Sequence, residues 1–298
     1  MNTALPDSLP ALAVTGSTGV LGGMVARTLA AAEVPQRLLA RSVDRAPQLD
    51  GSVALPFSYS DRAASERALE GVHTLFMVSA AENAERLAQH LAFIDSARAA
   101  GVRHIVYTSF IAAAPDATFT LARDHYATEE YIRSSGIDYT FLRDSLYLDF
   151  MPALVGTDGV IRGPAGTGRV AAVARADVAR TAVTVLNDVT AHHNVTYDLT
   201  GPEALTMTEV AAILTAAGSA QAGSSVAGTV RYHAETLPEA YESRRPWGAP
   251  DWQVDAWVST YTAIAAGEMA EVSTAVETIT GVQPMSLAHL LAGRTGRG

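Results

Sequence analysis

Short apolar runs alternate with helix-like segments through the first half of the chain. The runs cover residues 11–14, 37–40, 53–57, 74–78, 104–109 and 139–143. Their apolar residues do not alternate with polar ones, which is typical of strands buried on both faces. Between the runs, apolar residues recur at helical spacing, as Leu87, Leu91 and Ile94 do. This alternation predicts an α/β fold, a Rossmann-type doubly wound parallel sheet.

The pattern is looser beyond residue 150. We expect strands over 170–174 and 195–199, a helix to Leu186 capped by Asp177, and a capping box over Thr206–Glu209. A loop rich in Gly, Ser and Ala follows over 218–228, and helices are expected over 235–242, 251–266, 271–280 and 286–292. We therefore expect a dinucleotide-binding domain over 1–150. Residues 151–298 would form a smaller, mostly helical substrate-binding domain, interleaved with late strands of the main sheet.

Three glycines stand between the first predicted strand and the helix that follows it. They have the spacing Gly-x-x-Gly-x-x-Gly, and Leu21, Val25 and Leu29 recur at helical spacing behind them. A glycine-rich turn between a strand and a helix is where dinucleotide-binding folds hold their phosphates. The candidate phosphate site consists of Gly16, Ser17, Thr18, Gly19, Val20, Leu21 and Gly22.

Each glycine has a separate task in this prediction. Gly16 can adopt the backbone angles of a tight turn, and Gly19 leaves no side chain between the backbone and a pyrophosphate. Gly22 allows the helix to lie close to the strand. The free amides at the start of the helix, with the positive end of its dipole, would bind the anion.

The composition excludes several kinds of chemistry. The net charge is −10, which argues against nucleic acid as a partner. The chain has no cysteine, so disulfides and thiol catalysis are excluded. It also has no lysine, so all 21 basic residues are arginine. A Walker phosphate-binding loop, a Schiff base and a catalytic Tyr-x-x-x-Lys pair are therefore excluded.

Targeting segments and metal motifs are not evident in the sequence. The N-terminus lacks a signal pattern, and no apolar run reaches membrane-spanning length. We expect a cytoplasmic protein with no membrane partner. His192 and His193 are adjacent but lie in a polar, turn-like stretch, so we expect no metal site.

Several short motifs, taken in the order in which they occur along the chain, resemble those of one protein family. They are Thr15–Gly19 with Gly22, Leu39–Arg41, Ala99–Val102, Val106–Ser109, His125–Glu129, Ser135–Arg143 and Thr280–Ser286. Together they span nearly the whole chain. The chain resembles the NmrA-like atypical short-chain dehydrogenase/reductases, and most of all the branch of NADPH:quinone oxidoreductases and triphenylmethane reductases.

The resemblance implies further cofactor contacts. Arg41 occupies the position at which NADPH-preferring members present a guanidinium to the 2′-phosphate, so NADPH or NADP is expected rather than NADH. The alternative is a solvated arginine at a strand end. Ser58 departs from the acidic residue of many relatives, which leaves the adenine contacts open. Residues expected beside the ribose and nicotinamide are Val78, Ser79, Thr108, Ser109 and Phe110. The alternative for Ser79 and Ser109 is that they are strand-end hydroxyls that hydrogen-bond the loop backbone.

Two catalytic candidates also come from the resemblance. His125 lies on the helix that carries the Tyr-x-x-x-Lys pair in typical members, where it would donate a proton or orient the nicotinamide. The alternative is a histidine that packs the helix. Tyr147 follows the sixth predicted strand and would form a wall of the substrate pocket, although core packing explains it nearly as well.

We expect NADPH-dependent transfer of hydride to a quinone-like or other conjugated acceptor. Such acceptors need little acid assistance, because the phenol-like oxygen of a hydroquinone has a pKa near ~10. A flat pocket lined by aromatic residues near the C-terminus, or alternatively a helix core or homodimer contact, would consist of Tyr241, Trp247, Trp252, Trp257 and Tyr261. Two other functions stay open: a non-catalytic NADP-sensing regulator, and a pathway-dedicated ketone or enone reductase.

Overall fold

The chain folds into two compact units in the computed structural model, which describes residues 9–219 and 228–295. Unit 1 comprises Met1–Ser109, Tyr126–Leu142 and Val178–Tyr197. Unit 2 comprises Phe110–His125, Arg143–Asp177 and Asp198–Gly298. Each unit is therefore assembled from segments that are distant in sequence.

The first half of the chain forms alternating strands and helices, as predicted. The strands are β1 (Leu12–Thr15), β2 (Gln36–Ala40), β3 (Ser52–Pro56), β4 (Thr74–Met77), β5 (His104–Phe110) and β6 (Asp138–Asp144). The helices are α1 (Val20–Ala31), α2 (Arg62–Leu69), α3 (Arg86–Ala99) and α4 (Thr120–Ser135), with a short 3-10 helix η1 (Val43–Arg45). Asp61 caps α2 by accepting a hydrogen bond of 3.0 Å from the Ala64 amide.

These strands, with β9 (Val195–Leu199), form one seven-stranded sheet in the order β3-β2-β1-β4-β5-β6-β9. The pairs β2·β3, β1·β2, β1·β4 and β4·β5 are parallel. The chain moves outward from β1 to β3 and then returns to the other side of β1 with β4. This reversal between β1 and β4 is the switch point at which doubly wound sheets bind ligands. The predicted fold class is confirmed.

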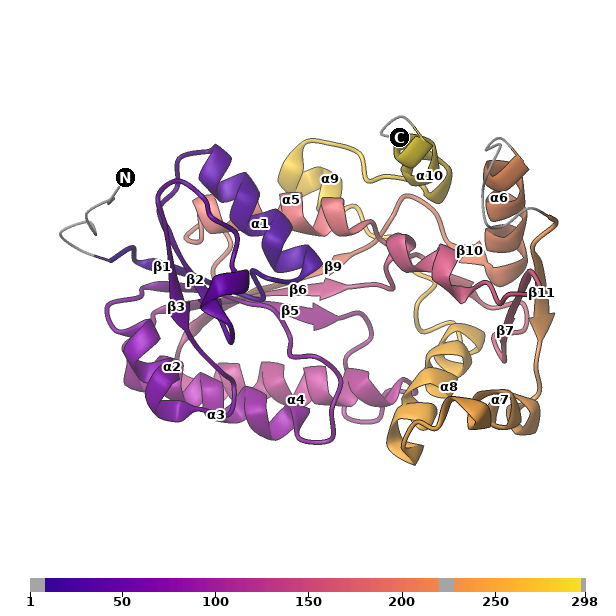
Figure 1. Cartoon of the computed structure of the whole chain (residues 1–298), viewed down its shortest axis with the longest axis horizontal. Coiled ribbons are helices and arrows are strands. Elements are labelled where there is room, and N and C mark those ends of the chain that lie inside the picture. Colours follow the sequence, from indigo (N-terminus) through magenta and orange to yellow (C-terminus); the bar gives the residue numbers. More distant parts are fainter. Residues whose placement is uncertain (1–8, 220–227, 296–298) are drawn as a thin grey trace. The chain divides into compact units, whose positions relative to one another are not determined.

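The core of unit 1 lies between its sheet and its helices. Helix α1 covers one face of the sheet, and α2 and α3 cover the other (Figure 1). Strands β1, β2 and β4 contribute side chains that are almost fully buried, and α3 packs Phe93 and Ile94 against them. Because helices cover both faces of this sheet, its strands contain consecutive apolar residues rather than alternating apolar and polar ones.

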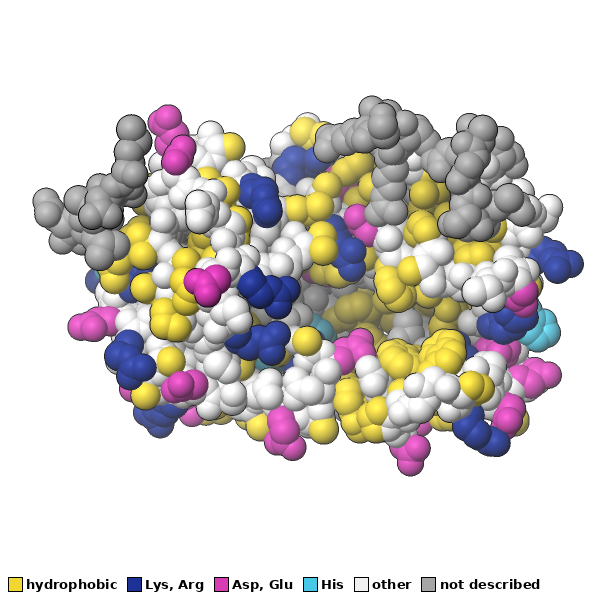
Figure 2. Space-filling view, viewed as in Figure 1, with side chains coloured by type: hydrophobic (Ala, Val, Ile, Leu, Met, Phe, Trp, Pro, Cys, Tyr) yellow, Lys and Arg dark blue, Asp and Glu magenta, His cyan; other side chains and the backbone are white. Residues whose placement is uncertain are grey.

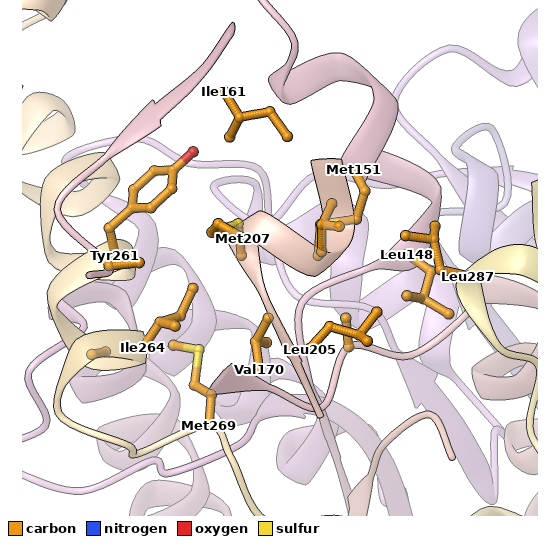
Figure 3. Packing of buried hydrophobic residues seen from close by; sticks show 14 of the residues in the cluster. Leu148, Met151, Ile161, Val170, Leu205, Met207, Tyr261, Ile264, Met269 and Leu287 are labelled. Carbon is orange, nitrogen blue, oxygen red and sulfur yellow. The ribbon is translucent and has the colours of Figure 1, made fainter. Parts of the chain in front are cut away.

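Unit 2 combines short sheets with helices. Its strands are β7 (Val160–Gly163), β8 (Arg169–Val170), β10 (Leu205–Thr206) and β11 (Arg231–Ala234). Helical segments are η2 (Leu148–Leu154), α6 (Met207–Ser219), α7 (Leu237–Arg244), η3 (Arg245–Trp247), α8 (Asp251–Ala265), α9 (Ala275–Thr280) and α10 (Leu287–Thr295). Helix α5 (Arg175–Asn187) begins in unit 2 and continues into unit 1. Figure 3 shows the buried cluster of this unit, including Leu148, Met207 and Tyr261.

Some predictions for the second half need correction. Strand β8 ends at Val170, and Val173 makes only an isolated bridge with Tyr147. Among the described late strands only β9 joins the main sheet, because β10·β8 and β11·β7 pair separately. Asp177 lies inside the first turn of α5 and accepts a hydrogen bond of 2.6 Å from the Met285 amide, so it does not cap that helix.

Other local predictions are confirmed. Thr206 and Glu209 form the capping box, with the Thr206 amide donating to Glu209 at 2.8 Å and the Glu209 amide donating to Thr206 at 3.1 Å. The predicted loop over 218–228 falls largely outside the described residues. No helix within 9–219 and 228–295 is long and apolar enough to span a membrane. Acidic and basic side chains are interspersed on the face shown in Figure 2.

Candidate functional site

The glycine turn of unit 1 has the backbone geometry that its sequence predicted. Gly16 has φ of +65°, in the left-handed region that glycine tolerates. The Gly19 amide donates to the Gly16 carbonyl oxygen at 2.9 Å and closes the turn, and Gly19 is the N-cap of α1. The chain thus reverses tightly between β1 and the start of α1.

The other two glycines differ in what surrounds them. A Cβ at position 22 would lie 2.7 Å from the Thr15 carbonyl oxygen and closer still to that of Gly16. Gly22 therefore holds α1 close to β1. A Cβ at position 19 would have only the Gly16 carbonyl oxygen nearby, at 3.3 Å, and Gly19 is exposed. Gly19 leaves the approach to the helix start open, which suits a pyrophosphate.

The seven residues of the turn do not all face the same way. Thr18, Gly19 and Val20 are exposed, whereas Ser17 and Leu21 are buried. The buried Ser17 hydroxyl has no hydrogen-bond partner among the described residues. A buried hydroxyl without a partner is costly unless a ligand supplies one. Together with the open helix start, it fits a bound dinucleotide phosphate.

A tyrosine that the sequence analysis did not single out joins the two strands at the switch point. Tyr59 donates to the Val78 carbonyl oxygen and, at 3.3 Å, to the Thr15 hydroxyl. That hydroxyl also accepts a hydrogen bond of 2.8 Å from the Val78 amide. Burial raises the pKa of Tyr59 above its ordinary value, so the phenol remains a donor. Tyr59 positions the glycine turn, and no motif around residue 59 marks it.

Two backbone amides in the segment after β4 already donate hydrogen bonds within the protein. The Ser79 amide donates to Thr108 at 2.9 Å, and the Ala80 amide donates to Nε2 of His90 at 2.9 Å. The hydroxyl of Ser79 has no partner among the described residues. Of the residues predicted to contact the cofactor here, Ser79 has a hydroxyl that is available to a ligand. The Thr108 hydroxyl instead accepts a hydrogen bond from the loop after β4.

Ser109, at the end of β5 within unit 1, is already engaged. Its hydroxyl donates to the fully buried Glu129 carboxylate at 2.6 Å, and Arg133 lies 3.5 Å from the other oxygen of that carboxylate. This hydrogen bond joins β5 to α4. The arrangement favours a supporting role for Ser109 over a direct contact with the cofactor.

Arg41 follows the last residue of β2 and is exposed. No hydrogen bond or ion pair joins it to the described residues, so its guanidinium is available to an anion. The end of β2 is where a dinucleotide-binding fold places the adenosine ribose. The 2′-phosphate role of Arg41 stays a prediction.

The two catalytic candidates and Phe110 belong to unit 2. His125 is buried, and its ring centroid lies 6.1 Å from that of Phe110. Tyr147 is half-buried and donates a hydrogen bond of 2.7 Å to Asp144. The sequence analysis did not single out Asp144, because an acidic residue at the end of a strand is not by itself a sign of function.

The predicted aromatic cluster separates into buried and exposed members. Tyr261 is buried in the unit 2 core, and Trp247 packs edge-on against Trp257 with centroids 5.4 Å apart. Trp247 and Tyr241 remain largely exposed. Within 9–219 and 228–295 no group of His, Asp and Glu residues is arranged to hold a metal ion.

The sheet order and the glycine turn define a Rossmann-type dinucleotide-binding protein. The NAD(P)H-binding family matches residues 16–189, and the chain belongs to that family. Its cofactor is NAD(P)H.

The chain is similar in sequence to two named enzymes, a quinone oxidoreductase and an azoreductase. It is 37% identical to quinone oxidoreductase 2 of Escherichia coli (strain K12) over 212 residues, 68% of this chain and 73% of that protein. It is 30% identical to an NAD(P)H azoreductase of Xenophilus azovorans over 273 residues, 90% of this chain and 92% of that protein.

Solved structures agree with these relatives. An NADPH-dependent quinone oxidoreductase from Escherichia coli, complexed with NADPH, has a TM-score of 0.84 at 30% identity, covering 95% of this chain and 99% of that chain. A Citrobacter triphenylmethane reductase complexed with NADP(H) has a TM-score of 0.82 at 30% identity, with the same coverage of 95% and 99%. The predicted resemblance is confirmed.

Proposed function

We propose that this NAD(P)H-dependent oxidoreductase uses NADPH to reduce a quinone-like or other conjugated acceptor. The strongest support is the similarity, over nearly all of its length, to an NADPH-dependent quinone oxidoreductase complexed with NADPH. Other similar proteins are named as an azoreductase and a triphenylmethane reductase, and azo and triphenylmethane dyes are also conjugated molecules. Conjugation, rather than one particular functional group, is what these acceptors share.

The residues of the chain suit hydride transfer by positioning. Bound NADPH would supply the hydride. The turn of Gly16 to Gly22 would hold the pyrophosphate, with the Ser17 hydroxyl donating to it and Arg41 pairing with the 2′-phosphate. A conjugated acceptor spreads the incoming charge over several atoms, so orientation supplies much of the rate.

We propose that His125 and Phe110 of unit 2 contact the acceptor. Their rings lie 6.1 Å apart in unit 2, and His125 is buried. A buried imidazole beside an aromatic ring suits contact with a flat ligand. We assign His125 an orienting role.

The experiment is a panel of acceptors with purified protein, followed by loss of NADPH absorbance. The panel holds a simple quinone, an azo dye, a cationic triarylmethane dye, an enone and a ketone. We expect oxidation of NADPH at least about tenfold above the rate without acceptor for the quinone. The same reactions with NADH should be slower, since NADH lacks the 2′-phosphate.

Two other outcomes would contradict the proposal. Tight NADP(H) binding by calorimetry without turnover of any acceptor would make the chain a cofactor-sensing regulator. Turnover of the enone or ketone, with no reaction of the quinone or the dyes, would instead favour a pathway-dedicated reductase.

A further inference from the structure

A buried acid and a tyrosine form a hydrogen-bonded pair in unit 2. Asp144 is the last residue of β6 and is only 2% exposed, and its Oδ2 accepts a hydrogen bond of 2.7 Å from the Tyr147 hydroxyl. Its other oxygen, Oδ1, is also buried and has no partner among the described residues. An ionised carboxylate with an unpaired buried oxygen is costly, whereas a neutral carboxylic acid is much less so.

The pair lies where a ligand is expected and is held firmly. The Ile111 amide, just after β5, donates to the Asp144 carbonyl oxygen at 3.0 Å. Asp144 therefore lies where the carboxyl ends of β5 and β6 are neighbours. Ligands of open α/β sheets bind outside the carboxyl ends of the strands. Tyr147 forms a bridge with Val173, and the Arg175 guanidinium lies 4.7 Å from the centroid of its ring.

The charged groups around the pair leave Asp144 without a direct cationic partner. Burial raises the pKa of Asp144 to about 8, although the Tyr147 hydrogen bond partly opposes this. Burial raises the pKa of Tyr147, and the carboxyl groups of Asp144 and Asp149 raise it further. The Arg175 guanidinium opposes this shift. Arg175 approaches the ring face rather than the carboxyl group, and its amide donates to Asp149 at 2.9 Å. At neutral pH Asp144 is therefore mostly protonated.

We propose that Asp144 stores the proton of the reaction and delivers it through the Tyr147 hydroxyl to an oxygen of the reduced acceptor. This inference rests on the proposed function. The pair would take the place of the Tyr-Lys pair that a chain without lysine cannot have.

The step balances as follows. Hydride from NADPH brings two electrons and one hydrogen, leaving an oxyanion on the reduced acceptor. For this transfer the hydrogen bond of the pair reverses: the Tyr147 hydroxyl turns from Asp144 to the oxyanion, and the protonated Oδ2 of Asp144 donates to the Tyr147 oxygen. The oxyanion then takes the Tyr147 proton as the Asp144 O–H bond breaks and that proton moves to the Tyr147 oxygen. Asp144 then recovers a proton from solvent. A phenol-like product oxygen has a pKa near ~10, so transfer from an acid with a pKa of about 8 is favourable.

This relay specifies the acceptor class more narrowly. Acceptors whose oxygen gains a proton, such as quinones and enones, would use the pair. A cationic triarylmethane dye takes only hydride and would not. The structure therefore favours an oxygen-bearing conjugated acceptor as the preferred substrate.

The test compares Asp144→Asn and Tyr147→Phe with a matched pair in unit 1. Tyr131 of α4 donates to Asp95 of α3 at 3.0 Å, and Asp95 is only partly buried, so Tyr131→Phe and Asp95→Asn make the same chemical changes without a buried acid. With a quinone, the wild-type rate should fall above pH ~8. Asp144→Asn should lower the rate about tenfold to a hundredfold at pH 7 and abolish that fall.

Tyr147→Phe should lower the rate with the quinone by a similar factor. The rates of both control variants should remain within about threefold of the wild-type rate. With the cationic dye, all four variants should remain within about threefold. Equal losses with quinone and dye, or an alkaline fall that survives Asp144→Asn, would assign the proton to another group, His125 foremost, and overturn the inference. No turnover of any acceptor by the wild type would contradict the proposed function itself.

A second readout does not depend on turnover. Carbon NMR of carboxyl-labelled aspartate, with Asp144→Asn to assign the signal, should give Asp144 a pKa well above its ordinary value. Near-ultraviolet circular dichroism should show that both variants fold. A pKa at or below about 5 would overturn the inference whatever the kinetics show.

Discussion

At the scale of single residues, we predict that cofactor preference depends on Arg41. It is exposed beyond β2 and has no partner among the described residues, so its removal should leave the fold unchanged. We expect Arg41→Ala to weaken NADPH binding by roughly 1.5–3 kcal/mol, about tenfold to a hundredfold, because a charge-assisted contact to the 2′-phosphate is lost. NADH binding should hardly change. Calorimetry with both cofactors measures the difference.

A second exposed arginine of the same unit provides the control. Arg67 lies in the last turn of α2, away from the glycine turn in sequence. Arg67→Ala should leave the affinity for both cofactors unchanged. Equal losses of NADPH and NADH affinity in Arg41→Ala would mean that Arg41 does not contact the 2′-phosphate.

At the scale of one element, we predict that cofactor binding and folding depend on different glycines of the turn. Gly19 is exposed and open, whereas Gly22 meets the backbone of Thr15 and Gly16. Gly19→Val should therefore abolish NADPH binding with a modest loss of stability, because the new side chain occupies the approach of the pyrophosphate. Gly22→Ala should instead destabilise unit 1 by about 1–3 kcal/mol through overpacking. Urea unfolding and calorimetry on both variants measure these effects.

The contrast between the two positions makes the prediction specific. If Gly19→Val unfolds the protein, the residue has a packing role. If it folds and still binds NADPH tightly, the pyrophosphate does not lie at this helix start.

At the scale of the whole molecule, buried histidines affect stability in acid. Burial lowers the pKa of His90 to about 3 and that of His104 to about 4. Nε2 of His90 accepts the Ala80 amide, and Nε2 of His104 lies 2.9 Å from the Thr140 hydroxyl. Both rings are thus held neutral. Below pH 6.5 the unfolded chain binds protons that the folded chain does not, so unfolding becomes easier as the pH falls.

Each histidine should contribute about 1.4 kcal/mol per pH unit between 6.5 and its folded-state pKa. Asp144 acts in the opposite direction, because its raised pKa makes the folded chain bind a proton that the unfolded chain lacks. The measurable quantity is therefore the difference between variants. His104→Gln should reduce the acid slope of the unfolding free energy by roughly 1 kcal/mol per unit from pH 6 to 4.5. The exposed His73→Gln should leave the slope unchanged, and equal slopes in all three proteins would contradict the assignment.

The sequence by itself determined the features that depend on short-range patterns. The order of strands and helices through β6, the turn at Gly16 and the capping box at Thr206 all follow from residues within a few positions of one another. Apolar period, cap chemistry and the backbone freedom of glycine act locally, so they can be recognised without knowing the partners. The resemblance extended this to the family and its cofactor.

Only the tertiary structure decided which distant residues meet. Tyr59 reaches Thr15 across 44 positions, and the Val78 amide reaches Thr15 across 63. Strand β9 joins the main sheet, while β8 pairs with β10. The partnership of Asp144 and Tyr147 spans only three positions, but its chemistry depends on burial by the surrounding fold. Burial and long-range pairing depend on how the whole chain packs, and a linear pattern does not specify that packing.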